Sequence, residues 1–379
     1  MKRVIQFCRQ EAVLTIAVIL AVCSMFVIHP DAGYVSYIDF RTLAILFCLM
    51  TIVAGLQKLG IFDRMAEALL EKVNGVTGIV MILVLLCFVL SMFITNDVAL
   101  ITFVPLTIII MNRMEEQIRK KWLLRCVVMQ TIAANLGSML MPIGNPQNLY
   151  LYGKSGMDIL SFVRLMLPYT IASLLLLVIW IVFCGGRAAK QSVTVSKAAK
   201  SRSFQKEDRE FLIVYLILFT LSLLTVAHLL PYPILFVLVL GYTVLRSREI
   251  LKKIDYALLG TFTALFLFIG NLGRIPQFSE FLEQIMEGRE MLTAVAASQV
   301  MSNVPAAILL AGFTDQYKAL IVGTNLGGLG TLIASMASLI SFKYIAKEMP
   351  HQKMRYLMEF TAANLVFLAC LLVLWNGIK

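Results

Sequence analysis

The feature that most constrains this chain is its series of long apolar runs. A helix needs about 20 apolar residues to cross the hydrocarbon core of a bilayer. Runs of that order lie at 12–28, 41–59, 123–150, 161–184, 210–229, 256–273, 319–346 and 356–376, with a shorter run at 231–246. Because 60% of the 379 residues are hydrophobic, a soluble domain could not bury them all. We predict an all-α membrane protein with about nine full spanning helices.

Composition argues against several other classes of protein. The basic, apolar N-terminus resembles a signal peptide, but no small-residue cleavage site closes it, so we expect a permanent first helix. The seven cysteines are scattered and form no CxxC pair, which favours buried thiols over metal ligands or disulfides. No HExxH or GxxxxGK[ST] motif is present, so we predict neither an enzyme nor an ATP-driven pump.

The net charge of +11 is explained by membrane topology rather than by nucleic-acid binding. Lys and Arg collect on the cytoplasmic loops of membrane proteins. They cluster here at the N-terminus and in 112–125, 185–209, 246–253 and 343–355, whereas 29–41 and 274–290 are acidic or nearly neutral. We predict a multi-pass protein of the inner (plasma) membrane, with its N-terminus in the cytoplasm and its C-terminus outside.

This charge pattern requires two segments to leave the membrane on the side by which they entered. The first is 77–111, which has Thr95-Asn96-Asp97 near its middle, and the second is 291–312, with Ser302-Asn303-Val304-Pro305. Each is predicted to form a helical hairpin, re-entrant or fully spanning. Polar residues favour tips that are buried in protein, because irregular backbone is not tolerated against lipid. The first hairpin would open to the cytoplasm and the second to the outside.

The two halves of the chain repeat the same features in the same order. Phe93–Ala99 matches Val300–Ala306, Asn135-Leu136-Gly137-Ser138 matches Asn325-Leu326-Gly327-Gly328, and Gly144-Asn145-Pro146 then falls opposite Ala334-Ser335-Met336. Because the two hairpins face opposite ways, the pattern is an inverted-topology repeat, which is typical of secondary transporters. We expect an N-terminal half at 1–184, a basic cytoplasmic linker at 185–209 and a C-terminal half at 210–379.

The interrupted segments predict the binding site. A helix that starts at mid-membrane presents unpaired backbone N–H groups, which attract an anion, while freed carbonyls attract a cation. For the substrate we expect Thr95, Asn96, Asp97, Asn145, Ser302, Asn303 and Ser335. The alternative for Asn96 and Asn303 is simple helix capping, which is compatible with binding.

Asp97 is the one carboxylate that this topology places deep in the membrane. Intramembrane acids are functional candidates by default. Beside an anion site, a carboxylate would repel the substrate unless it were protonated or paired with a cation. Asp97 is therefore a candidate proton carrier or cation ligand, and the alternative is a charged helix cap.

These motifs resemble the ion transporter superfamily that includes citrate-transporter-like proteins, divalent anion:sodium symporters and arsenite permeases. Ser302–Ala307 is similar to the second hairpin signature of that group, and Asn96-Asp97 is similar to the first hairpin of arsenite permeases. The resemblance implies one cation site at Thr95, Asn96, Gly144 and Asn145, and another at Ser302, Asn303, Ala334 and Ser335. It also implies a moving transport domain and a scaffold that is often dimeric.

Three functions remain open at this point. The first is secondary active transport of a carboxylate or inorganic oxyanion, coupled to Na⁺ or H⁺ and without another cofactor. The second is efflux of arsenite or a related neutral hydroxide, which Asp97 favours. The third is cation:proton antiport without an organic substrate, which Asp97 favours and against which the two predicted helix starts argue.

Overall fold

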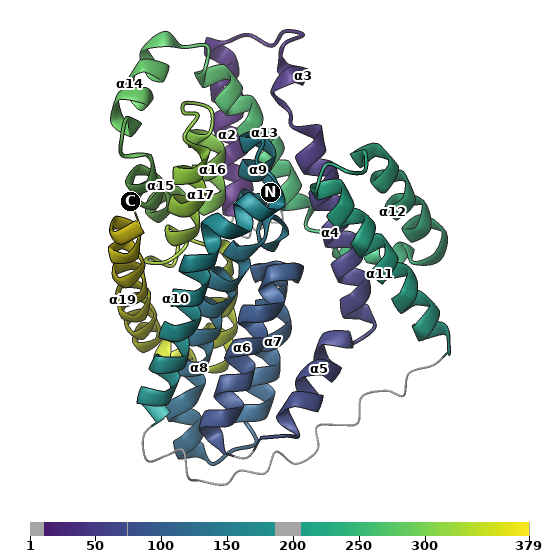
Figure 1. Cartoon of the computed structure of the whole chain (residues 1–379), viewed down its shortest axis with the longest axis vertical. Helices are drawn as coiled ribbons and strands as arrows, with labels where there is room; N and C mark the ends of the chain where they lie inside the picture. The colour runs from purple at the N-terminus through teal and green to yellow at the C-terminus, as the bar shows by residue number, and fades with distance from the viewer. Residues whose placement is uncertain (1–10, 74, 186–205, 379) are drawn as a thin grey trace.

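The computed structural model describes residues 11–73, 75–185 and 206–378, which are built from helices, and no strand occurs among them. Within those ranges, six helices are long and apolar enough to cross a membrane. They are α4 (Phe40–Lys58), α6 (Val76–Ile94), α8 (Glu116–Gly137), α10 (Ile159–Gly185), α11 (Lys206–Val226) and α19 (Lys353–Ile378). The predicted fold class, an all-α membrane protein, is confirmed (Figure 1).

Shorter helices account for the other predicted runs. α2 (Ala12–Val27) and α12 (Tyr232–Arg246) are apolar, and α13 (Tyr256–Leu272) bends by 103° into the short helix α14 (Pro276–Met286). The run 123–150 divides into α8 and α9 (Pro146–Ser155), and 319–346 divides into α17 (Tyr317–Leu326) and α18 (Met336–Glu348). Pro142 and Pro146 cannot continue the first helix, and glycines weaken the second.

Both hairpins are present as pairs of helices that are separated by one residue. α6 and α7 (Asn96–Met111) meet at Thr95, and α15 (Glu290–Met301) and α16 (Asn303–Leu310) meet at Ser302. The base of the first pair contacts α5 (Ile61–Leu70), and the base of the second contacts α14. Figure 1 shows α5 at the bottom of the molecule and α14 at the top, so the hairpins open to opposite ends.

Specific contacts group the charged segments by end. Lys58 pairs with Glu249 at 3.3 Å, and Asn112 donates to Glu348 at 2.9 Å. The first contact joins 246–253 to the end of α4, and the second joins 112–125 to 343–355 at the end of α7. Because α5, which follows α4, also contacts α7, these segments lie toward the same end. Arg274 pairs with Asp31 at 2.6 Å and joins the acidic segments at the other end. This grouping agrees with the charge pattern, while residues 186–205 of the expected linker lie outside the described ranges and its boundaries stay a prediction.

Packing between helices follows the internal repeat. α2 packs on α13, and α12 packs on α4. A Cβ at Gly137 would lie 2.6 Å from the Ser91 Oγ, and one at Gly327 would lie 2.6 Å from the Ser298 Oγ. These are equivalent positions in the two halves, and only glycine allows such close approach of a hairpin to the helix that follows it.

Candidate functional site

The two hairpin tips share an unusual backbone conformation. Thr95 has φ 71° and ψ 152°, and Ser302 has φ 75° and ψ 154°. Among the non-glycine residues that the structure describes, only these two and His228 have positive φ. A conformation that L-residues rarely adopt costs about 1–3 kcal/mol and is typical of functional sites. The same strain therefore recurs at matching points of the repeat.

Asn135 links the first tip to the second half of the chain. Its Oδ1 accepts from the Asn96 Nδ2 at 3.0 Å and from the Ser335 Oγ at 3.0 Å. Its Nδ2 donates to the Gly328 carbonyl at 3.5 Å. All of these side chains are buried, with Asn135 only 4% exposed. A buried amide with satisfied donors and acceptors fixes the relative position of the segments that it joins.

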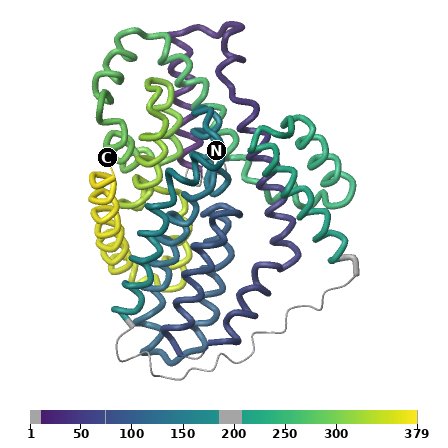
Figure 2. Tube along the Cα trace, viewed as in Figure 1, coloured from purple at the N-terminus to yellow at the C-terminus, as the bar shows by residue number. Residues whose placement is uncertain are grey.

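Asn325, the equivalent of Asn135, makes the reciprocal link. Its Oδ1 accepts from the Asn145 Nδ2 at 3.0 Å, and its Nδ2 donates to the Asn148 Oδ1 at 2.5 Å. The broken segments that carry these residues lie side by side in the interior, where the teal and yellow-green parts of the trace meet (Figure 2). The break of each half is thus held by the asparagine of the other half.

The second tip offers fewer free backbone N–H groups than the first. The Asn303 N–H donates to the Ala334 carbonyl at 3.0 Å, and Pro305 has no N–H. At the first tip, the Asp97 N–H donates to the Asn96 Oδ1 at 3.0 Å.

The break between α8 and α9 is also tightly folded. A Cβ at Gly144 would lie 2.0 Å from the Ser138 carbonyl oxygen, so the chain passes very close to itself there.

Asp97 faces a cavity of about 310 Å³ beside the first tip. Thr95 and Gln57 also line this cavity, and Lys253 and Asp255 lie at its edge, where both are exposed. The Asp97 Oδ1 is buried and has no hydrogen-bond partner in the described part of the chain. An unpaired carboxylate oxygen at this depth is costly when charged.

An equivalent cavity of about 240 Å³ lies beside the second tip, but its lining is apolar. It contains Ser302 and Pro305 in place of Thr95 and Val98, and α13 lies beside it as α4 lies beside the first. Val304 occupies the position of Asp97. The repeat therefore supplies two similar hollows, of which only the first combines a carboxyl group with other polar side chains.

The expected site residues are brought together in two connected groups. Asn96 and Ser335 meet at Asn135, whereas Asn145 meets Asn325, and Asn303 lies against Ala334 and Gly328. Sequence reasoning omitted Asn135, Asn325 and Asn148 from the site. The repeated Asn-Leu-Gly motif already marked the first two, but it was used only to align the halves. No cluster of His, Cys, Asp or Glu suited to a metal ion occurs within the described residues.

Two oppositely directed hairpins with strained tips, joined by buried amides in an all-helical membrane protein, define a membrane transport protein. A model of the citrate transporter (CitMHS) family matches residues 8–318, and the chain belongs to that family.

Individual relatives agree with this assignment. The chain is 31% identical to the inner membrane protein YbiR of Escherichia coli, with 84% of each chain covered. It is 33% identical to the uncharacterized transporter MJ0456 of Methanocaldococcus jannaschii over 81% of each. The fold is similar to the YdaH transporter of Alcanivorax borkumensis, with a TM-score of 0.59 at 12% identity over 92% of this chain and 88% of that one.

Proposed function

We propose that this protein is a secondary transporter that moves a small anion, a carboxylate or an inorganic oxyanion, across the inner membrane together with a proton. The observation that carries the proposal is the buried, unpartnered carboxyl oxygen of Asp97, which lines a cavity beside the Thr95 tip together with apolar side chains and a few polar ones. Protonation would remove the charge that repels an anion, so the proton and the substrate would bind together. Membership of the citrate transporter family and the similarity to YbiR support transport in that membrane.

The first tip is the better anion site of the two. At the second tip, Pro305 offers no N–H and the Asn303 N–H is already bonded to Ala334. At the first tip, the start of α7 faces the cavity that Asp97 lines, and helix starts attract negative charge. Lys253 and Asp255 both lie at the edge of this cavity, so their opposite charges offset each other there.

A proton suits the site better than a sodium ion. The Asn96 Oδ1 accepts from the Asp97 N–H, and the Asn145 Oδ1 accepts from the Asn148 N–H at 2.9 Å. A cation at these amide oxygens would therefore have only the one remaining lone pair of each oxygen to bind. Sodium coupling through the two expected cation sites is thus the less favoured variant of the proposal.

Efflux of a neutral hydroxide is a second candidate. The chain is 28% identical over 179 residues to the silicon efflux transporter LSI3 of rice, which covers 45% of this chain and 35% of that one. A neutral hydroxylated substrate would not be repelled by Asp97 and could donate to its free Oδ1. Cation:proton antiport is the third candidate and has no additional support.

Thermal unfolding of the purified protein with candidate ligands tests the proposal. Citrate, succinate, sulfate, tungstate, arsenite and silicic acid would be compared, each with sodium or lithium and across a range of pH. We expect one of the anions to raise the melting temperature, and to raise it more at acidic pH. Stabilisation by silicic acid or arsenite alone would favour efflux, and stabilisation by sodium and pH without any anion would favour antiport.

A further inference from the structure

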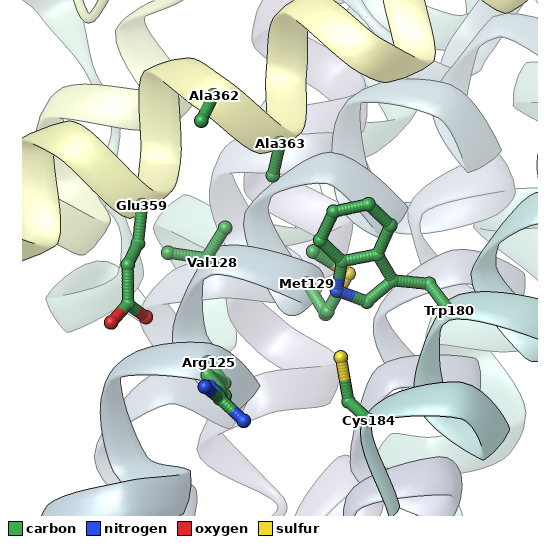
Figure 3. A pocket seen from close by; sticks show the side chains of 8 residues that line it. All are labelled: Arg125, Val128, Met129, Trp180, Cys184, Glu359, Ala362 and Ala363. Atoms are coloured by element: carbon green, nitrogen blue, oxygen red, sulfur yellow. The ribbon is translucent and has the colours of Figure 1, made fainter.

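A separate hollow opens between three helices away from the transport cavity. It has a volume of about 230 Å³ and lies between α8, the last turns of α10 and the first turns of α19. Figure 3 shows the Trp180 ring and the Cys184 thiol on one side, Arg125 and Glu359 on the other, and the small side chains of Ala362 and Ala363 above. We call this hollow the Arg125 groove.

The Arg125 groove lies near the membrane surface, at the end of the molecule that carries the basic segments. Arg125 follows the exposed Lys121 by one helical turn. Cys184 is the next-to-last residue of α10, and Glu359 lies about 9 Å from the start of α19 by helical rise. Trp180, a residue type enriched at membrane interfaces, forms one wall.

The groove contains one positive charge, on Arg125, that is not matched by a negative one. Glu359 pairs with Arg355 at 2.8 Å, so its carboxylate is already matched. Arg125 is half-buried, and no carboxylate of the described residues lies within ion-pair distance of its guanidinium. A partly desolvated guanidinium that lacks a counter-ion favours a bound anion, and its fork of donors fits the oxygens of a phosphate or a carboxylate.

The floor of the groove is apolar. Val128 and Met129 are 2% and 3% exposed and form its base, with Ala363 facing them from above. These apolar side chains offer a soluble anion no hydrogen bond, whereas an acyl chain can pack against them. Basic pockets between transmembrane helices on the cytoplasmic side are suited to anionic lipid head groups.

We propose that the Arg125 groove binds an anionic phospholipid of the cytoplasmic leaflet, with the phosphate on Arg125 and the start of an acyl chain against Trp180 and Ala363. The lipid would bridge α8, which packs on the first hairpin, to α10 and α19. This site is independent of the transport cavity and of the identity of the transported substrate.

Native mass spectrometry of the purified protein with phosphatidylglycerol or phosphatidylcholine tests the proposal. We expect the protein to retain phosphatidylglycerol about tenfold more strongly, because the choline cation of phosphatidylcholine offsets the attraction of its phosphate to Arg125. Arg125→Gln should abolish this preference. Lys121→Gln removes the same charge from an exposed position on the same helix and should keep it. Glycerol phosphate, which has the head group without acyl chains, should not compete.

Ala362→Trp supplies a second test that leaves the charge unchanged. Ala362 is exposed at the groove, so a large ring there should fill it without disturbing the core and should also abolish the preference. If Arg125→Gln does not fold, Arg125→Lys and Ala362→Trp decide the question. The proposal is overturned if Arg125→Gln or Ala362→Trp retains phosphatidylglycerol as the parent does, or if Lys121→Gln loses it equally.

Discussion

At the scale of single residues, the two halves differ in chemistry at the hairpin tips, although the backbone conformation of the two tips is nearly the same. Thr95 and Ser302 have φ values of 71° and 75°, yet the residue after the tip asparagine is Asp97 in one half and Val304 in the other. The sequence alone identified this difference, because the tips could be aligned by their motifs. It could not identify the partners of the asparagines, since those contacts join residues up to 200 positions apart.

Asn135 provides a residue-scale prediction. Asn135→Ala would leave the donors of Asn96 and Ser335 buried without their acceptor, at a cost of about 1–3 kcal/mol for each unsatisfied group. We expect a clear fall in melting temperature and a loss of transport. Asn112→Ala, which removes an exposed amide that bonds to Glu348, should change the melting temperature little. Equal stability of the two variants would contradict the bridging role of Asn135.

At the scale of elements, the apolar runs were predictable from the sequence. The points at which the helices are interrupted were predictable only in part. Pro142 and Pro146 marked the break after α8, because proline cannot continue a helix. The break between α17 and α18 contains no proline and depends on Gly327, Gly328 and Gly330. Glycine is common in membrane helices, so its presence alone does not show where a helix ends.

The packing of α6 against α8 gives a prediction at this scale. In Gly137→Ala the new methyl group would lie 2.0 Å from the Phe88 carbonyl oxygen, and backbone cannot move aside cheaply. We expect a lower melting temperature and impaired transport. Gly241→Ala in α12 meets only open space and should be neutral or stabilising by up to about 1 kcal/mol. A Gly137→Ala variant as stable as the parent would disprove this close approach.

The ion pair between Asp31 and Arg274 predicts a pH dependence. The hydrogen bond that Asp31 accepts from Arg274 holds the pKa of Asp31 below the ordinary value of 3.8. A carboxyl group with a lowered folded-state pKa stabilises the protein above its unfolded pKa, and this contribution is lost as the pH falls through the folded value. Arg274→Gln should therefore melt slightly lower than the parent at neutral pH, and the difference should vanish at strongly acidic pH. A difference that persists there would contradict this account.

At the scale of the whole molecule, charge and repetition together predicted the architecture. The basic segments had to share one end; Asn112–Glu348 joins two of them, and Lys58–Glu249 joins the third to the end of α4. The opposite directions of the hairpins followed from the same argument. Two properties depend on neighbours outside the chain and stay predictions, namely the location of the termini relative to the membrane and the possible homodimer.

The proposed function depends on a difference between the two repeated halves, namely the lining of their equivalent cavities. Two equivalent cavities of about 310 Å³ and 240 Å³ flank the tips, but only the first contains a carboxyl group. The inverted repeat would let the same movement expose the site to either side of the membrane. The cavity that Asp97 lines would then couple that movement to a proton, and the apolar cavity would take no part in the coupling.

The most direct test is uptake into proteoliposomes under an imposed pH gradient, with the anion that stabilises the protein most. The parent should accumulate the anion when the gradient drives protons inward. Asp97→Asn should fold but should lose the dependence on the gradient, and Asp63→Asn, which alters an exposed acid on α5, should retain it. Gradient-driven accumulation that persists in Asp97→Asn would contradict the account.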